Sequence, residues 1–281
     1  MYQRNVLRTL AALAIVGVGA SIVAHGPTAR AASVGVRHLQ AGSSLHLINP
    51  GYLTVGSDTT YPPMESVVNG QAEGADVDLA NALAHAMGLK GAKVISNDFN
   101  TIIPSMLIRH KFDVIMSSMN DNPDRRKSVL FVDYMKSSQA ILVRTSSSIR
   151  GNSYAAVCGH SIAVESGTTE LDGLNAQNKT CKSKITIKIF TKDTDAYQAF
   201  VSRHTEAYTG DLPVVTYYVQ THRAIYRAAG KPFAAGEFYG IAMPRNAFKL
   251  RNAISQALRK IRANGQYRGI LQKWGVAGAA V

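Results

Sequence analysis

The chain has 281 residues, of which 46% are apolar, so it is long enough for about two globular domains and is neither disordered nor collagen-like. Lysine and arginine total 31 against 18 acidic residues, and the resulting net charge of +13 raises the question of nucleic-acid binding. The basic residues are spread as singles, pairs and one run of three at 125–127, with no block of five and no zinc-finger spacing, so we expect no nucleic-acid partner.

The first 31 residues have the pattern of a secretory signal peptide. Arg4 and Arg8 give a positive start, residues 10–24 are uncharged and apolar, and the tripeptide Ala-Arg-Ala at 29–31 is a small-residue exit site. We therefore expect export to the periplasm with cleavage after about Ala31. An uncleaved membrane anchor is the alternative, although this apolar segment is short for the roughly twenty residues that a spanning helix needs.

Export bears on the two cysteines, Cys158 and Cys181. In an oxidising compartment such a pair is usually bridged, and closing a loop of about 24 residues is worth roughly 3 kcal/mol in the chain-entropy model. Two buried free thiols are the alternative. No histidine or further cysteine lies at ligand spacing from either residue, so we expect no metal site.

After an arm over residues 32–44, strand and helix patterns alternate along the chain. The predicted strands lie at 52–56, 94–96, 112–117, 161–165, 185–190, 206–208 and 239–243. The predicted helices lie at 77–87, 100–108 and 248–263. Asn100 is expected to cap the second helix, with Pro104 in its first turn. This alternation predicts a mostly parallel sheet with helical crossovers, in two α/β units separated near the serines at 146–148.

Polar residues follow four of the predicted strands, and ligands of open parallel sheets bind beyond the carboxyl ends of strands. The segments are GSDTTYPPME at 56–65, SSMN at 117–120 with Arg125 after it, ESGTT at 165–169, and Asp211. Together they offer one arginine for a carboxylate, N–H groups at a helix start, short hydroxyl and amide donors, and acids for an ammonium group. This set suits an amino-acid zwitterion.

The order of the segments GSDTTYPPME, GADVDLANALA, DVIMSSMNDNPDRR, AVESGTTE and TGD resembles that of the family 3 extracytoplasmic solute-binding proteins of polar amino-acid ABC transporters. The resemblance covers about residues 53–275 and implies a type II periplasmic-binding-protein fold, with two α/β lobes, two crossovers and a ligand cleft between them. Lobe 1 would take residues 45–141 and 238–281, and lobe 2 residues 142–237. The implied partners are a free amino acid and an inner-membrane ABC permease, with no cofactor, and we expect a monomer.

The resemblance also implies roles for single residues. Arg125 would grip the ligand α-carboxylate, and Thr169 would donate its N–H to the same group. Asp211 would hold the α-ammonium together with the carbonyl of Ser118. Asn120 stands where the family usually has serine or threonine. The hydroxyl of that residue contacts the main-chain atoms of the bound amino acid in the family. The same segments contribute two further expected contacts, Ser117 and Thr168.

Side-chain specificity depends on four more positions. Tyr61 and Phe99 match family positions that sandwich the ligand side chain, and ordinary core packing is the alternative for both. Asp58 matches an acid that faces the far end of the ligand, and Glu165 stands where relatives commonly carry leucine or glutamine. Two aromatic faces and two carboxylates favour arginine, lysine, ornithine or histidine. If Glu165 points into solvent, glutamine or another neutral polar amino acid fits equally well.

Three further alternatives remain open at this point. Arg125 could form a surface ion pair with Asp121 or Asp124 instead of binding a ligand. Some proteins of this fold are periplasmic cyclohexadienyl or arogenate dehydratases. If this chain were such an enzyme, Glu165 or Asp211 would serve as general acid or base. A ligand sensor on the same scaffold is the third. The histidines fall on helix or turn patterns away from the strand ends, so we expect a binding protein with no catalytic residues.

Overall fold

The computed structural model describes residues 45–281. The predicted signal peptide, its cleavage after Ala31 and the arm over 32–44 lie outside the described residues. None of the helices between residues 45 and 281 combines the length and the apolar character needed to cross a membrane.

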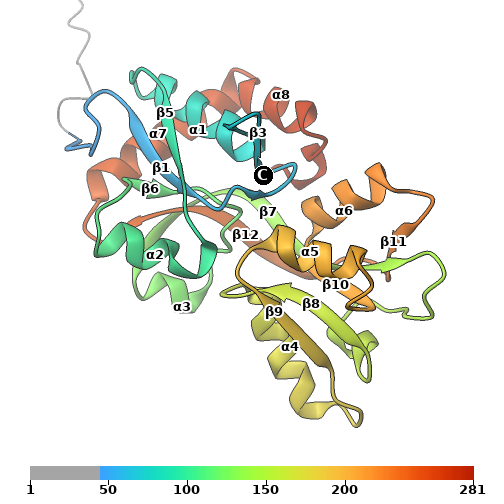
Figure 1. Cartoon of the computed structure of the whole chain (residues 1–281). Coiled ribbons are helices and arrows are strands. Elements are labelled where there is room, and N and C mark those ends of the chain that lie inside the picture. The colour runs from blue at the N-terminus through green and yellow to red at the C-terminus, as the bar shows by residue number, and fades with distance from the viewer. Residues whose placement is uncertain (1–44) are drawn as a thin grey trace, which may run out of the picture. The chain divides into compact units, whose positions relative to one another are not determined.

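Nine strands form one sheet through these residues (Figure 1). They are β1 (Leu53–Ser57), β5 (Ala92–Ser96), β6 (Val114–Ile115), β7 (Val129–Arg144), β8 (Ser161–Glu165), β9 (Thr186–Phe190), β10 (Ala207–Asp211), β11 (Tyr226–Ala228) and β12 (Phe233–Pro244). Their order is β5-β1-β6-β12-β7-β10-β8-β9, with β11 paired to β7. Three short strands make a second, antiparallel sheet: β2 (Thr60–Tyr61), β3 (Glu65–Val68) and β4 (Gln71–Glu73).

Helices cover both faces of the strands. They are α1 (Ala75–Ala86), α2 (Phe99–Leu107), α3 (Pro123–Arg126), α4 (Thr169–Thr180), α5 (Asp193–Val201), α6 (Leu212–Thr221), α7 (Phe248–Ala263) and α8 (Gln266–Lys273), with the short 3₁₀ helices η2 (Tyr154–Val157) and η3 (Ala277–Ala279). In Figure 1, α1, α7 and α8 lie together on one side of β1, β5 and β6, and α2 lies on the other side. Helix α7 has the predicted bounds, and its predicted apolar stripe, which includes Leu250 and Ile254, is buried.

The sheet divides into two lobes that share its middle. Lobe 1 comprises β1 to β6 with α1, α2, α3, α7 and α8, and lobe 2 comprises β8 to β11 with α4, α5 and α6. The long strands β7 and β12 pair antiparallel with each other and extend into both lobes, so the chain crosses between the lobes twice. The expected architecture of two lobes with two crossovers is confirmed. The lobe boundaries at residues 141 and 237 fall inside β7 and β12 and stay a prediction.

The expectation of a mostly parallel sheet is right only for the outer strands. The pairs β1/β5, β1/β6, β8/β9 and β8/β10 are parallel, whereas β7 pairs antiparallel with β10, β11 and β12. The cause is the double crossing, because a strand that leaves a lobe and one that returns must run in opposite directions. The sequence pattern around β7 did not yield this strand in the prediction.

Helix α2 also departs from the prediction at its start. It begins at Phe99 with Asp98 as the preceding residue, so Asn100 lies inside the helix and is not its cap. The N–H of Phe99 is instead accepted by Oδ2 of Asp58 at 2.8 Å, a partner from a distant segment that local patterns do not reveal. Pro104 consequently lies in the interior of the helix.

Lobe 2 has an apolar cluster of its own, beside the disulfide. Cys158 and Cys181 are bonded, which confirms the predicted bridge and shows that the alternative of free thiols is wrong. The two cysteines are the residues that follow η2 and α4. The bridge therefore ties the ends of these two helices to the cluster around Val157 and Leu174.

Candidate functional site

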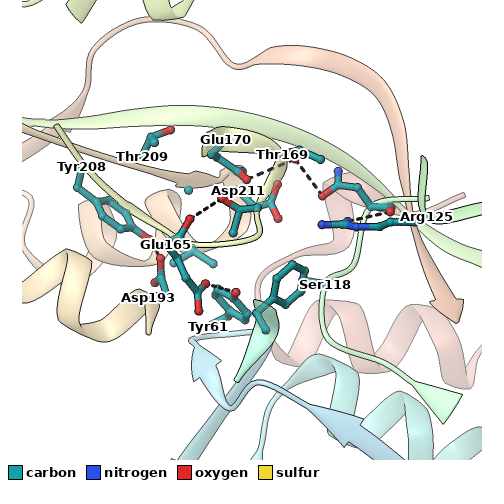
Figure 2. A pocket seen from close by; sticks show the side chains of 15 residues that line it. Tyr61, Ser118, Arg125, Glu165, Thr169, Glu170, Asp193, Tyr208, Thr209 and Asp211 are labelled. Atoms are coloured by element: carbon teal, nitrogen blue, oxygen red, sulfur yellow. Dashed lines mark hydrogen bonds between the residues drawn. The ribbon is translucent and has the colours of Figure 1, made fainter. Parts of the chain in front are cut away.

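A narrow cavity with a volume of about 20 Å³ lies between the lobes. Nine of the eleven predicted ligand-binding residues line it: Tyr61, Phe99, Ser118, Asn120, Arg125, Glu165, Thr168, Thr169 and Asp211. Asp58 and Ser117 do not. The remaining lining residues were not predicted: Glu170, Asp193, Tyr208, Thr209, Gly210 and Val214. Figure 2 shows Arg125 on one side of the cavity, and Glu165, Asp193 and Tyr208 on the other.

Direct contacts join the two lobes around this cavity. Arg125 of lobe 1 donates from Nη2 to the carbonyl oxygen of Gly167 in lobe 2 at 3.1 Å, and Tyr61 donates its O–H to Oε2 of Glu165. A β-carbon on Gly167 would lie 2.9 Å from Cα of Asn100, and the φ of Gly167 is +78°. Glycine is therefore needed here for the close approach as well as for the backbone conformation. The structure has the lobes closed upon each other.

Arg125 has no acidic hydrogen-bond partner among residues 45–281. Its guanidinium donates to the carbonyl oxygens of Asn120, at 2.9 Å, and of Gly167, and it lies 5.2 Å from the ring centre of Phe99. The two neighbouring acids pair with other cations, because Asp121 binds Arg126 and Asp124 binds Lys127. The alternative of a surface ion pair for Arg125 is therefore wrong. Burial lowers the pKa of Arg125, but a guanidinium keeps its charge in proteins.

The loop of Ser117 and Ser118 rests on two buried acids of lobe 1. Ser117 donates to Oε1 of Glu65 at 3.0 Å and accepts the N–H of Asp58, so its hydroxyl faces away from the cavity. Ser118 has a φ of +42°, which is unusual for a residue with a side chain. Its N–H donates to Asp76 at 2.9 Å and its hydroxyl to Glu65 at 3.3 Å. These bonds hold Ser118 at the cavity wall.

The side chain of Asn120 forms hydrogen bonds with polar groups of both lobes. Its Nδ2 donates to Oγ of Ser137 at 2.8 Å and to Glu237 at 2.7 Å, and its Oδ1 accepts from Thr169 at 3.4 Å. Ser137 in turn donates to Oδ1 of Asp211 at 3.3 Å. The side-chain amide therefore has protein partners for each of its atoms, in the place where a hydroxyl was expected from the resemblance.

Thr168 and Thr169 begin helix α4 at the cavity. The hydroxyl of Thr168 accepts the N–H of Leu171 at 3.3 Å, which makes it the capping residue, and donates to the carbonyl oxygen of Glu165 at 2.8 Å. The hydroxyl of Thr169 accepts from Gln139. The first N–H groups of an α-helix have no partner within the helix and favour negative charge. This helix start can therefore support a carboxylate.

Asp58 does not line the cavity, and both of its carboxyl oxygens accept hydrogen bonds within lobe 1. Its Oδ1 accepts from the hydroxyl of Thr60 at 2.7 Å, and its Oδ2 accepts the N–H of Phe99. It is 2% exposed, and burial raises its pKa. Its position suggests that it fixes the start of α2 and so the ring of Phe99.

Tyr61 and Phe99 both line the cavity, but the rings meet edge to face, with centres 5.9 Å apart and an interplanar angle of 89°. No side chain fits between two rings in direct contact, so this arrangement differs from the expected sandwich. Both residues are also buried, at 8% and 7% exposure, and belong to the apolar core. They are therefore core residues as well as cavity residues.

Lobe 2 contributes three buried acids to the cavity: Glu165, Glu170 and Asp193. Each has one carboxyl oxygen without a hydrogen-bond partner. Their second oxygens are used, since Glu165 accepts from Tyr61, Asp193 from Tyr208 at 2.6 Å, and Glu170 from Thr169 at 3.3 Å. An unpartnered buried oxygen costs free energy, which a ligand that supplied N–H donors to these atoms would recover.

Burial raises the pKa values of these acids. It takes the pKa of Glu165 to about 10, with further contributions from the nearby Asp193 and Asp58. It takes the pKa of Asp193 to about 8 and also raises the pKa of Glu170. Burial likewise raises the pKa of Asp211, with Glu170 next to it. Without a cation beside them, Glu165 and Asp193 hold protons at neutral pH.

The unpredicted residues lie close to signals that were in the sequence. Glu170 directly follows Thr169, and Thr209 and Gly210 precede Asp211 in the TGD segment. Asp193 follows β9, so the rule of examining strand ends would have found it as well. Tyr208 can be identified as a cavity residue only from the structure, through its hydrogen bond to Asp193. Within residues 45–281, no group of three or more acidic, histidine or cysteine side chains is arranged to hold a metal ion.

Two lobes joined by two crossovers and closed over a polar cavity define a protein that encloses a small ligand. Residues 53–277 match the family of bacterial extracellular solute-binding proteins, family 3. Since the match spans most of the chain, the chain belongs to this family. The predicted resemblance is confirmed, and so is the expectation of a binding protein instead of an enzyme.

Individual relatives agree with this assignment. The chain is 29% identical over 230 residues to the ABC transporter arginine-binding protein 1 of Escherichia coli, covering 79% of this chain and 90% of that protein. It is 28% identical to the glutamine-binding protein GlnH of Bacillus subtilis, covering 78% and 79%. Among solved structures, an ancestral arginine-binding protein bound to arginine superposes with a TM-score of 0.73 at 31% identity, covering 80% of this chain and 98% of that one. The relatives are binding proteins, and the dehydratase alternative gains no support from them.

Proposed function

We propose that this protein captures a cationic amino acid (arginine, lysine, ornithine or histidine) in the periplasm and delivers it to an inner-membrane ABC permease. The observation that carries the proposal is the set of ionisable residues that line the cavity, where one arginine faces four acidic residues. One guanidinium suits one α-carboxylate. Four acids exceed what a single α-ammonium requires, so the excess favours a second positive group on the ligand.

The proposed orientation follows from the two ends of the cavity. Arg125 and the start of α4 at Thr169 would bind the α-carboxylate, and Asp211 would bind the α-ammonium. The side chain would then point toward Glu165 and Asp193, where unpartnered carboxyl oxygens are found. Because the ligand would contact Arg125 in lobe 1 and Asp211 in lobe 2, it would stabilise the closed arrangement more than an open one.

Glutamine is a second candidate. The specific observation in its favour is that burial raises the pKa of Glu165 to about 10, because a neutral carboxyl group both donates and accepts hydrogen bonds, as a side-chain amide requires. A relative named for glutamine binding is consistent with it. The further expectations, a monomer whose leader is cleaved after about Ala31, belong to this proposal as well.

A thermal-shift screen of the mature chain against the twenty amino acids, ornithine and citrulline tests the proposal. A ligand at one hundred times its dissociation constant adds about 2.7 kcal/mol to the free energy of unfolding. For a chain of this size that is a rise of roughly 5–10 °C in Tm. We expect the rise with cationic amino acids. A rise with glutamine alone would favour the second candidate, and no rise with any amino acid would refute both.

A further inference from the structure

The Asp193 end of the cavity, made of Glu165, Asp193 and the tyrosines that bind them, has a property that a simple anionic pocket lacks. Glu165 and Asp193 are 1% and 2% exposed, and each leaves one oxygen without a partner while the other accepts a tyrosine O–H. Figure 2 shows both carboxyl groups on the side of the cavity away from Arg125. A buried carboxylate needs a cation or several donors, and one neutral O–H supplies neither.

The groups that face these two acids are themselves acidic or neutral. From the segment before β2 and from β2 come Asp58 and Tyr61, from α4 comes Glu170, and from β10 comes Tyr208. Arg125 is the cation that lines the cavity, and its guanidinium donates to two backbone carbonyl groups. Nothing among the described lining residues therefore compensates negative charge at the Asp193 end.

We infer that binding of a cationic amino acid releases protons from Glu165 and Asp193 to the solvent. The inference rests on the proposed function, since it takes the cationic side chain to lie at the Asp193 end. In the absence of a cation both carboxyl groups hold their protons, in keeping with their burial. A positive group beside them favours the ionised form, so each proton lost leaves a carboxylate that pairs with the ligand. Affinity then increases with pH.

The sign and size of the effect follow from linkage. When binding releases one proton, the association constant increases about tenfold for each pH unit below the pKa of the free protein. The pKa of Asp193 is raised to about 8 and that of Glu165 to about 10 by burial, so the slope holds between about pH 6 and 7.5. Arginine is the suitable probe, because its guanidinium stays charged throughout this range.

Isothermal titration with L-arginine at pH 7, in phosphate and in Tris, measures the release directly. Tris takes up protons with a much larger heat than phosphate, so the difference between the two binding enthalpies gives the number of protons exchanged. We expect about one proton or more released per arginine. This measurement needs no variant and does not depend on any substituted protein folding.

The double variant Glu165→Gln/Asp193→Asn assigns the protons. Glu170 and Asp211 stay intact in it, so any proton that they release is common to both proteins. We expect the pH slope of affinity to fall by at least half, and the slope of the control Asp195→Asn, an exposed acid on the same helix α5, to match that of the wild type.

The outcomes separate this inference from the proposed function. Arginine that binds with equal heats in both buffers overturns proton release but leaves the proposed function standing. A double variant that keeps the full slope overturns the assignment to Glu165 and Asp193. Failure of every cationic amino acid to bind overturns the proposed function, and the inference with it.

Discussion

The two lobes differ in how their fully buried acids are hydrogen-bonded, whereas the half-buried Asp133 of β7 also has an oxygen without a partner. Seven carboxyl side chains are buried among the described residues, four in lobe 1 (Asp58, Glu65, Asp76 and Asp113) and three in lobe 2 (Glu165, Glu170 and Asp193). In lobe 1, every oxygen of the four accepts a hydrogen bond from a nearby backbone or side-chain donor. In lobe 2, each of the three has an oxygen that accepts none.

This difference distinguishes acids that stabilise the fold from acids that lack hydrogen-bond donors until a ligand binds. A fully partnered buried carboxyl group returns the cost of its burial through its hydrogen bonds. Asp113, for example, accepts the N–H groups of Ile48 and Thr54 at 2.9 and 2.8 Å and so fixes the start of β1. An unpartnered oxygen does not recover the free energy of its burial in the free protein. Such oxygens are expected where a ligand supplies the missing donors.

The largest expected effect is a loss of ligand affinity on replacement of Arg125, the cation that lines the cavity between the lobes. Arg125→Ala should weaken binding of arginine by at least about 1,000-fold, roughly 4 kcal/mol, because it leaves a desolvated carboxylate without its charged partner. Stability should change by no more than about 1 kcal/mol, since the guanidinium of Arg125 donates to two carbonyl groups and contacts the ring of Phe99 but pairs with no acid among the described residues. Isothermal titration and chemical unfolding measure the two quantities.

Arg126→Ala is the matched control for that variant, because Arg126 is the next residue and its exposed guanidinium pairs with Asp121. It should leave affinity within about twofold, because Arg126 does not line the cavity. Retained arginine binding by Arg125→Ala would remove Arg125 from the site and with it the proposed orientation of the ligand.

The next largest effect concerns a fully partnered acid of lobe 1. Asp76→Ala should lower the free energy of unfolding by about 3 kcal/mol, because it leaves the buried O–H of Tyr134 and the N–H of Ser118 without acceptors. Asp193→Asn, in lobe 2, should not lower it at pH 6 and should raise it by up to about 3 kcal/mol, because the wild-type acid takes up a proton on folding and the amide does not, while the amide oxygen still accepts from Tyr208. Urea unfolding at pH 6 measures both, and equal losses would contradict the division between the lobes.

The sequence predicted the lobe 2 acids less well than the fold. Alternating patterns located seven of the twelve strands and three of the eight α-helices of the described residues. Five ordered segments were enough for the two-lobed architecture and for eight of the cavity residues, and Phe99 came from the resemblance outside those segments. Those signals are local. Whether Asp58 or Asp193 lines the cavity depends on which distant backbone N–H or hydroxyl claims its oxygens, and a single sequence does not record these pairings.

The dependence of stability on pH gives a smaller effect. Burial raises the pKa of Asp193 to about 8, so the folded state holds a proton that the unfolded chain releases above about pH 4. Its stabilising contribution is complete at low pH and is lost as the pH increases toward 8, at about 1 kcal/mol per pH unit. Unfolding of the ligand-free protein at pH 6, 7 and 8 should show this decline.

Asp193→Asn should reduce the steepness of the decline by about 1 kcal/mol per pH unit, and the exposed Asp195→Asn should not. A wild-type protein that gains stability between pH 6 and 8, or an Asp193→Asn variant with the wild-type slope, would mean that Asp193 is ionised in the free protein.

The smallest effect is the most specific. Glu165→Gln should weaken arginine about fivefold while leaving glutamine within about twofold, because the variant loses a group that ionises for a cation but keeps one that hydrogen-bonds a neutral amide. The loss is modest because the wild-type protein must first release a proton, which offsets part of the attraction. Stability at neutral pH should not fall, since Tyr61 can donate to the new amide oxygen and the amide takes up no proton on folding. Titration with both amino acids, beside the exposed control Asp172→Asn on α4, measures the ratio. An equal change for the two ligands would mean that Glu165 does not distinguish their side chains, and the excess of acids in lobe 2 would then need another explanation.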